Sequence, residues 1–143
     1  MKSLLALILS ITLVAFTADA FAGENAYFAK DNEPLYGTWI NMDYRSRPAQ
    51  KITFNSNGTV GASYQAASIE PNRRMKYLIT GKWTDSKGNI MYKEHWVGNW
   101  GEEAYSLIKI SNSGNTLEYV FDHDKYPKEV DPKHIYYRKY TRK

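Results

Sequence analysis

The chain has 143 residues, a formal net charge of +4 and no cysteine. Without cysteine the protein has neither a disulfide to supplement a small core nor a thiol for a lipid anchor, so the burial of apolar side chains must stabilise it. Twelve tyrosines, five phenylalanines and four tryptophans supply much of the apolar area. One aromatic side chain buries about 150–250 Å².

Residues 1–22 have the organisation of a secretory signal peptide. Lys2 precedes an apolar run, Leu4–Phe16, that is shorter than the ~20 residues a membrane-spanning helix needs. Ala20-Phe21-Ala22 then offers a small-x-small cleavage site, and we expect cleavage after Ala22. The pattern predicts a periplasmic or secreted, soluble protein with no transmembrane segment in its mature form. An uncleaved N-terminal anchor is the alternative.

The rest of the chain divides into a short leader and one domain. Residues 23–34 are polar and end in Asn32-Glu33-Pro34, which predicts a flexible leader. Residues 35–143 are long enough for a single domain with a modest core. Positive charge gathers after Lys125, and we interpret it as a solvated strand face and a charged terminus. Nucleic acid is not expected as a partner, because an exported protein rarely meets it.

Alternation of apolar and polar residues predicts eight short strands. In chain order they are Leu35–Tyr44, Gln50–Phe54, Thr59–Tyr64, Met75–Thr84, Ile90–Val97, Glu103–Ser111, Thr116–Asp122 and His134–Thr141. Residues that favour tight turns separate three pairs of them, at Asn55–Gly58, Asp85–Asn89 and Asn112–Asn115.

Alternation also sorts the side chains of each strand into two faces, but it does not say which face is inward. In the fourth strand we expect one face to carry Met75, Tyr77, Ile79, Gly81 and Trp83. Eight consecutive antiparallel strands favour an up-and-down barrel, whose interior is either filled by side chains or holds one small ligand. Closure removes the exposed edges of the sheet. A two-sheet sandwich is the alternative.

Four segments resemble the strands of small bacterial lipocalin-like domains, which are calycin-type barrels. They are Leu35–Trp39 with its Gly-x-Trp pattern, Ile52–Val60, Tyr77–Trp83, and Tyr136-Tyr137-Arg138 with its aromatic-x-Arg ending. The resemblance covers nearly the whole domain in the right order. It implies that Trp39 lies across the barrel floor and that Arg138 packs over it as a structural closing pair. The chain is shorter than the larger lipocalins and lacks their disulfide.

Three functions are compatible with these patterns. The resemblance implies an exported barrel that binds a small apolar or amphipathic ligand, with candidate ligand-binding residues Tyr77, Ile79, Tyr92, His95 and Tyr119. The alternative is a filled barrel with a structural or protein-interaction role on the cell envelope, presenting an exposed aromatic patch around residues 96–100. A cofactor-free enzyme is the third, and it needs at least two polar groups converging in the interior, for which Tyr77, Tyr92, Glu94 and Tyr119 are the candidates.

No catalytic motif, cofactor or metal is predicted. Asp122-His123-Asp124, with Asp131 and His134 downstream, contains metal-ligating side chains. Ligands must converge on the ion, whereas neighbouring residues of a strand point to opposite faces. We therefore interpret this segment as a solvated strand end.

Overall fold

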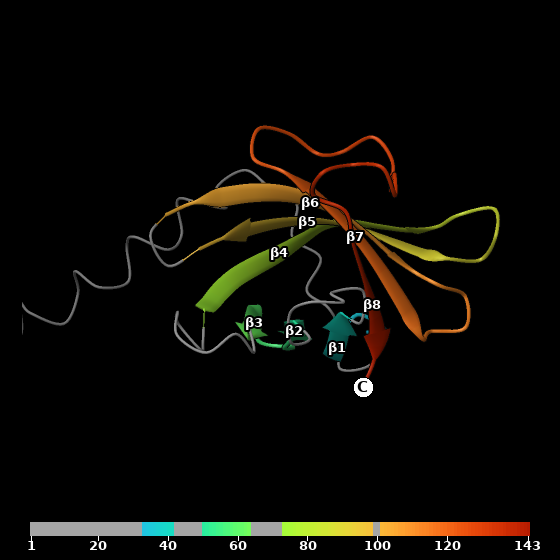
Figure 1. Cartoon of the computed structure of the whole chain (residues 1–143), viewed down its shortest axis with the longest axis horizontal. Helices are drawn as coiled ribbons and strands as arrows, with labels where there is room; N and C mark the ends of the chain where they lie inside the picture. Colours follow the sequence, from blue (N-terminus) through green and yellow to red (C-terminus); the bar gives the residue numbers. More distant parts are fainter. Residues whose placement is uncertain (1–32, 42–49, 64–72, 99–100) are drawn as a thin grey trace, which may run out of the picture.

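The computed structural model describes residues 33–41, 50–63, 73–98 and 101–143, and the predicted signal peptide and most of the predicted leader lie outside these ranges. The described residues form eight β-strands and no helix (Figure 1). They are β1 (Gly37–Asn41), β2 (Gln50–Phe54), β3 (Thr59–Ser63), β4 (Arg73–Thr84), β5 (Ile90–Val97), β6 (Glu103–Ile110), β7 (Thr116–Asp122) and β8 (Arg138–Arg142).

The strands close into one antiparallel barrel in chain order, β1 to β8, as the sequence predicts. Each strand pairs with the next, and β8 returns to pair with β1 through Trp39–Arg142 and Ile40–Thr141. In Figure 1 the red β8 accordingly lies beside the teal β1, while the long strands β4, β5 and β6 form the opposite wall. Closure of the sheet excludes the two-sheet sandwich.

The strand bounds follow the predicted ones closely except at β1 and β8. Leu35 lies in a turn, closed by the hydrogen bond from the Tyr36 N–H to the Glu33 carbonyl, so β1 begins at Gly37. The predicted last strand began at His134. The N–H groups of His134 and Tyr137 instead donate to carbonyls three residues earlier, which makes successive turns and delays β8 to Arg138.

A β-bulge divides β4 between Ile79 and Gly81. A bulge inserts one extra residue, so every side chain beyond it changes face. Tyr77 and Ile79 therefore belong to the core, whereas Trp83 lies on the outer face and is 42% exposed. The prediction that Trp83 shares a face with Tyr77 was wrong for this reason, and Lys82 takes the position opposite Tyr92.

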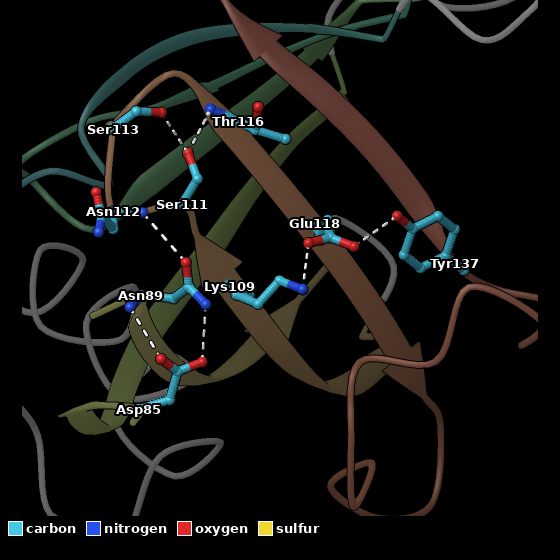
Figure 2. Close-up of polar contacts among 9 residues, drawn as sticks. All are labelled: Asp85, Asn89, Lys109, Ser111, Asn112, Ser113, Thr116, Glu118 and Tyr137. Atoms are coloured by element: carbon cyan, nitrogen blue, oxygen red, sulfur yellow. Dashed lines mark hydrogen bonds and ion pairs between the residues drawn. The ribbon is translucent and has the colours of Figure 1, made fainter. Parts of the chain in front are cut away.

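Side-chain hydrogen bonds fix the hairpins at one end of the barrel (Figure 2). Asp85 Oδ1 accepts hydrogen bonds from the backbone N–H groups of Lys87 and Asn89, and hydrogen bonding from Asn89 holds the pKa of Asp85 below its usual range. Asn89 in turn accepts from the backbone N–H of Asn112, which joins the second hairpin to the third. The second and third turns predicted from sequence therefore also bind one another.

On the outer face, Glu118 forms an ion pair with Lys109 and accepts a hydrogen bond from the Tyr137 hydroxyl (Figure 2).

The cation that packs over Trp39 comes from Arg142. The Trp39 ring is fully buried and its indole N–H donates to the Leu35 carbonyl. The guanidinium carbon of Arg142 lies 4.1 Å from the ring centre. The same guanidinium donates to the carbonyls of Tyr36, Pro34 and Gly114. It therefore ties β8 both to the floor of the barrel and to the segment that precedes β1.

Arg138, the predicted partner of Trp39, does not take this position. Pairing between β1 and β8 sets Arg142 opposite Trp39, and pairing between β7 and β8 sets Arg138 opposite Tyr119. The two arginines are four positions apart in β8, roughly 13 Å along the strand. The Arg138 guanidinium donates to the nearby carbonyls of Ile135 and Tyr137 instead. The closing pair is therefore Trp39 with Arg142.

Replacement of Arg142 by Ala is expected to lower the free energy of unfolding by about 1–3 kcal/mol, because the cation over Trp39 and its bonds to three carbonyls are lost. Lys139→Ala, an exposed cation on the same strand, is the matched control and should cost less than about 0.5 kcal/mol. Urea unfolding measures both through the midpoint at an unchanged slope. Equal losses in the two variants would contradict the assignment of Arg142.

Candidate binding site inside the barrel

The interior of the barrel contains a polar cluster in the middle of its longest wall. On β5 the inward positions alternate through Tyr92, Glu94 and Trp96, of which Tyr92 and Trp96 belong to the core. Glu94 lies opposite Ser106 of β6, and Tyr119 of β7 reaches the same level. We call Glu94, Trp96, Ser106 and Tyr119 the lumen cluster. All four are buried.

Glu94 is the ionisable centre of this cluster and is 1% exposed. Burial raises the pKa of its carboxyl from 4.5 to about 7, and hydrogen bonding with Ser106 and Tyr119 acts in the opposite direction. The Ser106 hydroxyl also donates to the Tyr119 hydroxyl at 3.0 Å. Burial, assisted by the nearby Glu94 charge, raises the pKa of Tyr119, so that Tyr119 stays neutral and can donate a hydrogen bond.

Two buried polar atoms of the lumen cluster have no hydrogen-bond partner within the part of the chain that the structure describes. They are Glu94 Oε2 and the indole nitrogen of Trp96. The Trp96 indole nonetheless lies close enough to Tyr119 to hold the pKa of that phenol lower than burial alone would. An unsatisfied buried group costs about 1–3 kcal/mol. Natural proteins therefore satisfy most such groups or use them for function. Here an acceptor and a donor lie on successive inward positions of one strand, an arrangement able to take both a donor and an acceptor of a bound molecule.

Aromatic rings connect the lumen cluster with the end of the barrel away from the three hairpins. Phe121 packs edge-on to Trp96 with ring centres 6.2 Å apart and stacks on Tyr136 at 4.5 Å. His123 lies within 6.5 Å of Trp96 by the same measure and is exposed. We call Trp96, Phe121, His123 and Tyr136 the aromatic mouth. These rings extend from the exposed His123 to the buried Trp96, which lies two residues from Glu94 on β5.

The opposite end of the barrel is closed by the segment before β1. Leu35 is buried in the core. Glu33 accepts a hydrogen bond from the Tyr92 hydroxyl at 2.8 Å and forms an ion pair with Lys82 at 2.8 Å. Burial and the Glu33 carboxylate raise the pKa of Tyr92. The charges at this end therefore neutralise each other.

Four of the five candidate ligand-binding residues lie in the core, as required for a site in the lumen, namely Tyr77, Ile79, Tyr92 and Tyr119. The hydroxyl of Tyr77 is engaged, since it donates to the Asn55 carbonyl at 2.8 Å.

His95, the fifth candidate, lies on the outer face of β5. Its ring stacks on Tyr105 with centres 4.6 Å apart, and its Nε2 lies 2.9 Å from a Glu103 carboxylate oxygen. His95 is nevertheless only 2% exposed. Tyr126, from the segment between β7 and β8, packs against Tyr105 on this outer side. His95 therefore faces away from the lumen, because its neighbours Glu94 and Trp96 take the inward positions.

The structure adds Trp96, Ser106 and Phe121 to the candidate site. Glu94, a sequence candidate for the enzyme, is buried opposite Ser106. Ser106 carried no sequence signal, since one serine in a strand is ordinary until its neighbours across the sheet are known.

The acidic and histidine residues at and beyond the end of β7 bond to nearby backbone groups. Asp122 and Asp131 each accept a hydrogen bond from a backbone N–H two residues later. The His134 Nδ1 accepts from the Tyr136 N–H, and the His123 Nδ1 lies 2.9 Å from the Glu103 carbonyl. Over the described ranges, no group of three or more His, Asp or Glu side chains is placed to hold a metal ion.

Comparison with protein-family models, curated proteins and solved structures found no match to this chain. The class is therefore defined by architecture: a closed barrel of eight antiparallel strands in chain order, which is a calycin-like arrangement.

Glu94 is expected to make the protein less stable as the pH rises. The folded carboxyl has a pKa of about 7 against an ordinary value of 4.5, so the folded state keeps a proton that the unfolded state loses. Between these values the free energy of unfolding should fall, in total by on the order of 3 kcal/mol. The stabilising contribution of protonated Glu94 is present in full below about pH 4.5 and is lost above about pH 7.

Urea unfolding of the wild type and of Glu94→Gln from pH 4.5 to 8 measures this effect. The difference between the two proteins isolates Glu94 from other titrating groups. Glu129→Gln, an exposed loop position, is the matched control and should follow the wild type. Parallel curves for wild type and Glu94→Gln would show that Glu94 is not buried as described.

Proposed function

We propose that the protein is an exported, lipocalin-like barrel that binds a small amphipathic molecule in its lumen. The observation that carries the proposal is the pair of unsatisfied atoms, Glu94 Oε2 and the Trp96 indole nitrogen, on the inward face of β5. A ligand whose polar group satisfies both, and whose apolar body packs among the rings of the mouth, offsets the cost of burying them.

A filled barrel with a purely structural role is less well supported by this interior. Such a core gains stability from apolar side chains, whereas a buried carboxyl costs free energy unless it is paired. The aromatic patch expected around residues 96–100 also loses a member, because Trp96 is buried in the core and residues 99 and 100 lie outside the described ranges. These observations favour the ligand-binding role.

A cofactor-free enzyme is the second candidate, favoured by the convergence of Glu94, Ser106 and Tyr119. A carboxyl with a pKa of about 7 is suited to accept or donate a proton at neutral pH, and a neutral Tyr119 is a hydrogen-bond donor. Both candidates require a bound molecule at the same place. Recovery of that molecule in a chemically altered form would favour the enzyme.

The compartment is part of the proposal and rests on residues 1–22. Across the described residues the structure has no helix long and apolar enough to cross a membrane. The intact mass of the protein isolated from a secreting host is expected to correspond to a chain beginning at Gly23, and N-terminal sequencing checks the cleavage position. A mass that includes residues 1–22 would contradict the export proposal and favour the uncleaved anchor.

Ligand entry is expected to alter the environment of the Trp96 indole N–H. With ¹⁵N-labelled protein, titration with 2-phenylethanol, a small molecule with one ring and one hydroxyl, should shift the Trp96 indole resonance, which is assigned with Trp96→Phe. Trp83, on the outer face, is the internal control and should not move. Shifts confined to Trp83, or no shift at millimolar probe, would overturn the lumen site for this class of ligand.

A further inference from the structure

We propose that the lumen site selects ligands that carry an ammonium group, with Glu94 as the counter-ion and the aromatic mouth as the surround of the cation. This inference deepens the proposed function and rests on it. It specifies the charge of the ligand, which the proposed function leaves open.

The first observation is that Glu94 has no cationic partner among the described residues. Burial, Ser106 and Tyr119 are the influences on its carboxyl, and no Lys or Arg of the described segments is among them. Three cations at inward positions of the described strands bind elsewhere: Lys82 pairs with Glu33, Arg142 packs over Trp39, and Arg138, opposite Tyr119, donates to the carbonyls of Ile135 and Tyr137. Buried charges are normally paired, so an ammonium group supplies what Glu94 lacks.

The second observation is that the negative charge of Glu94 acts on other groups inside the barrel. Burial is the main cause that raises the pKa of Tyr77 on β4 and of Tyr119 on β7, and the Glu94 charge adds to both. Both phenols therefore remain neutral at physiological pH, and neither of them supplies a competing charge. The field inside the barrel favours a cation over an anion at the level of Glu94 Oε2.

The third observation is the aromatic mouth. Trp96, Phe121 and Tyr136 are close enough to contact one another in series, with neighbouring ring centres 6.2 and 4.5 Å apart. Aromatic faces attract cations, and Trp is the best of them. A neutral or anionic group gains no such attraction on its way to Glu94. Ring packing also suits the apolar body of an arylalkylamine.

Three probes that share a phenyl ring and differ in the polar group test the proposal: phenethylamine, 2-phenylethanol and phenylacetate. The Trp96 indole shift gives the affinity of each for the wild type and for Glu94→Gln at pH 8. We expect phenethylamine to bind at least tenfold more tightly than either other probe. In Glu94→Gln this preference should be lost.

The pH dependence of the wild type gives a second readout that does not depend on a variant. Ionised Glu94 is needed to bind the ammonium, so the affinity for phenethylamine should rise about 30-fold from pH 5.5 to 8.5 for a pKa near 7. Affinity for phenylacetate should fall over the same range. His134→Gln, which removes an imidazole next to the mouth but not part of it, is the matched control and should keep the rise. Loss of the rise in this control would assign it to that imidazole and overturn the role of Glu94.

The outcomes separate this inference from the proposed function. Equal binding of all three probes to both proteins would overturn ammonium selection and leave the lumen site standing. Tighter binding of phenylacetate than of phenethylamine at pH 8 would also overturn it. Failure of every probe to move the Trp96 resonance would count against the lumen site itself.

Discussion

The barrel depends on the contact that closes it, between β8 and β1. This seam has only two paired positions, Trp39–Arg142 and Ile40–Thr141, whereas β4 pairs with β5 along the whole length of β5. Arg142 compensates by binding the indole face and three carbonyls from two other segments. Closure removes the sheet edges and also creates an interior, without which Glu94 would be an ordinary solvated carboxyl.

The two ends of the interior differ in chemistry. At the floor, the Glu33–Lys82 ion pair, the Tyr92 hydroxyl and Arg142 satisfy one another or backbone carbonyls. In the lumen cluster two polar atoms stay unsatisfied and a carboxyl has no cation beside it in the described chain. Folding alone does not require this second arrangement, because an apolar residue in place of Glu94 would leave no unpaired group. This contrast points to binding at the mouth end and to stability at the floor.

Local patterns predicted the fold well and the site only in part. The turns after Phe54, Thr84 and Ile110 are short-range features that Asn, Asp and Gly specify by their own conformational preferences, so the hairpins and the strand count followed from sequence. The bulge in β4 carried no comparable signal. It exchanges the faces of Lys82 and Trp83, and such a shift becomes visible only when the partner strand sets the register.

The unexpected positions of Arg138 and His95 have the same cause. Tyr136-Tyr137-Arg138 and Tyr140-Thr141-Arg142 share the aromatic-x-Arg pattern, and only the pairing of β8 with β1 shows that Arg142 faces Trp39. Glu94 and His95 are likewise adjacent, and the inward face of β5 is decided by Ser106 and Tyr119 on other strands and by Tyr105, which stacks on His95 outside. Sequence periodicity separates two faces, but long-range register says which is inside. In a closed barrel the chemistry of the lumen is therefore a property of the sheet as a whole, and Glu94 acquires its raised pKa from strands that the local sequence does not contain.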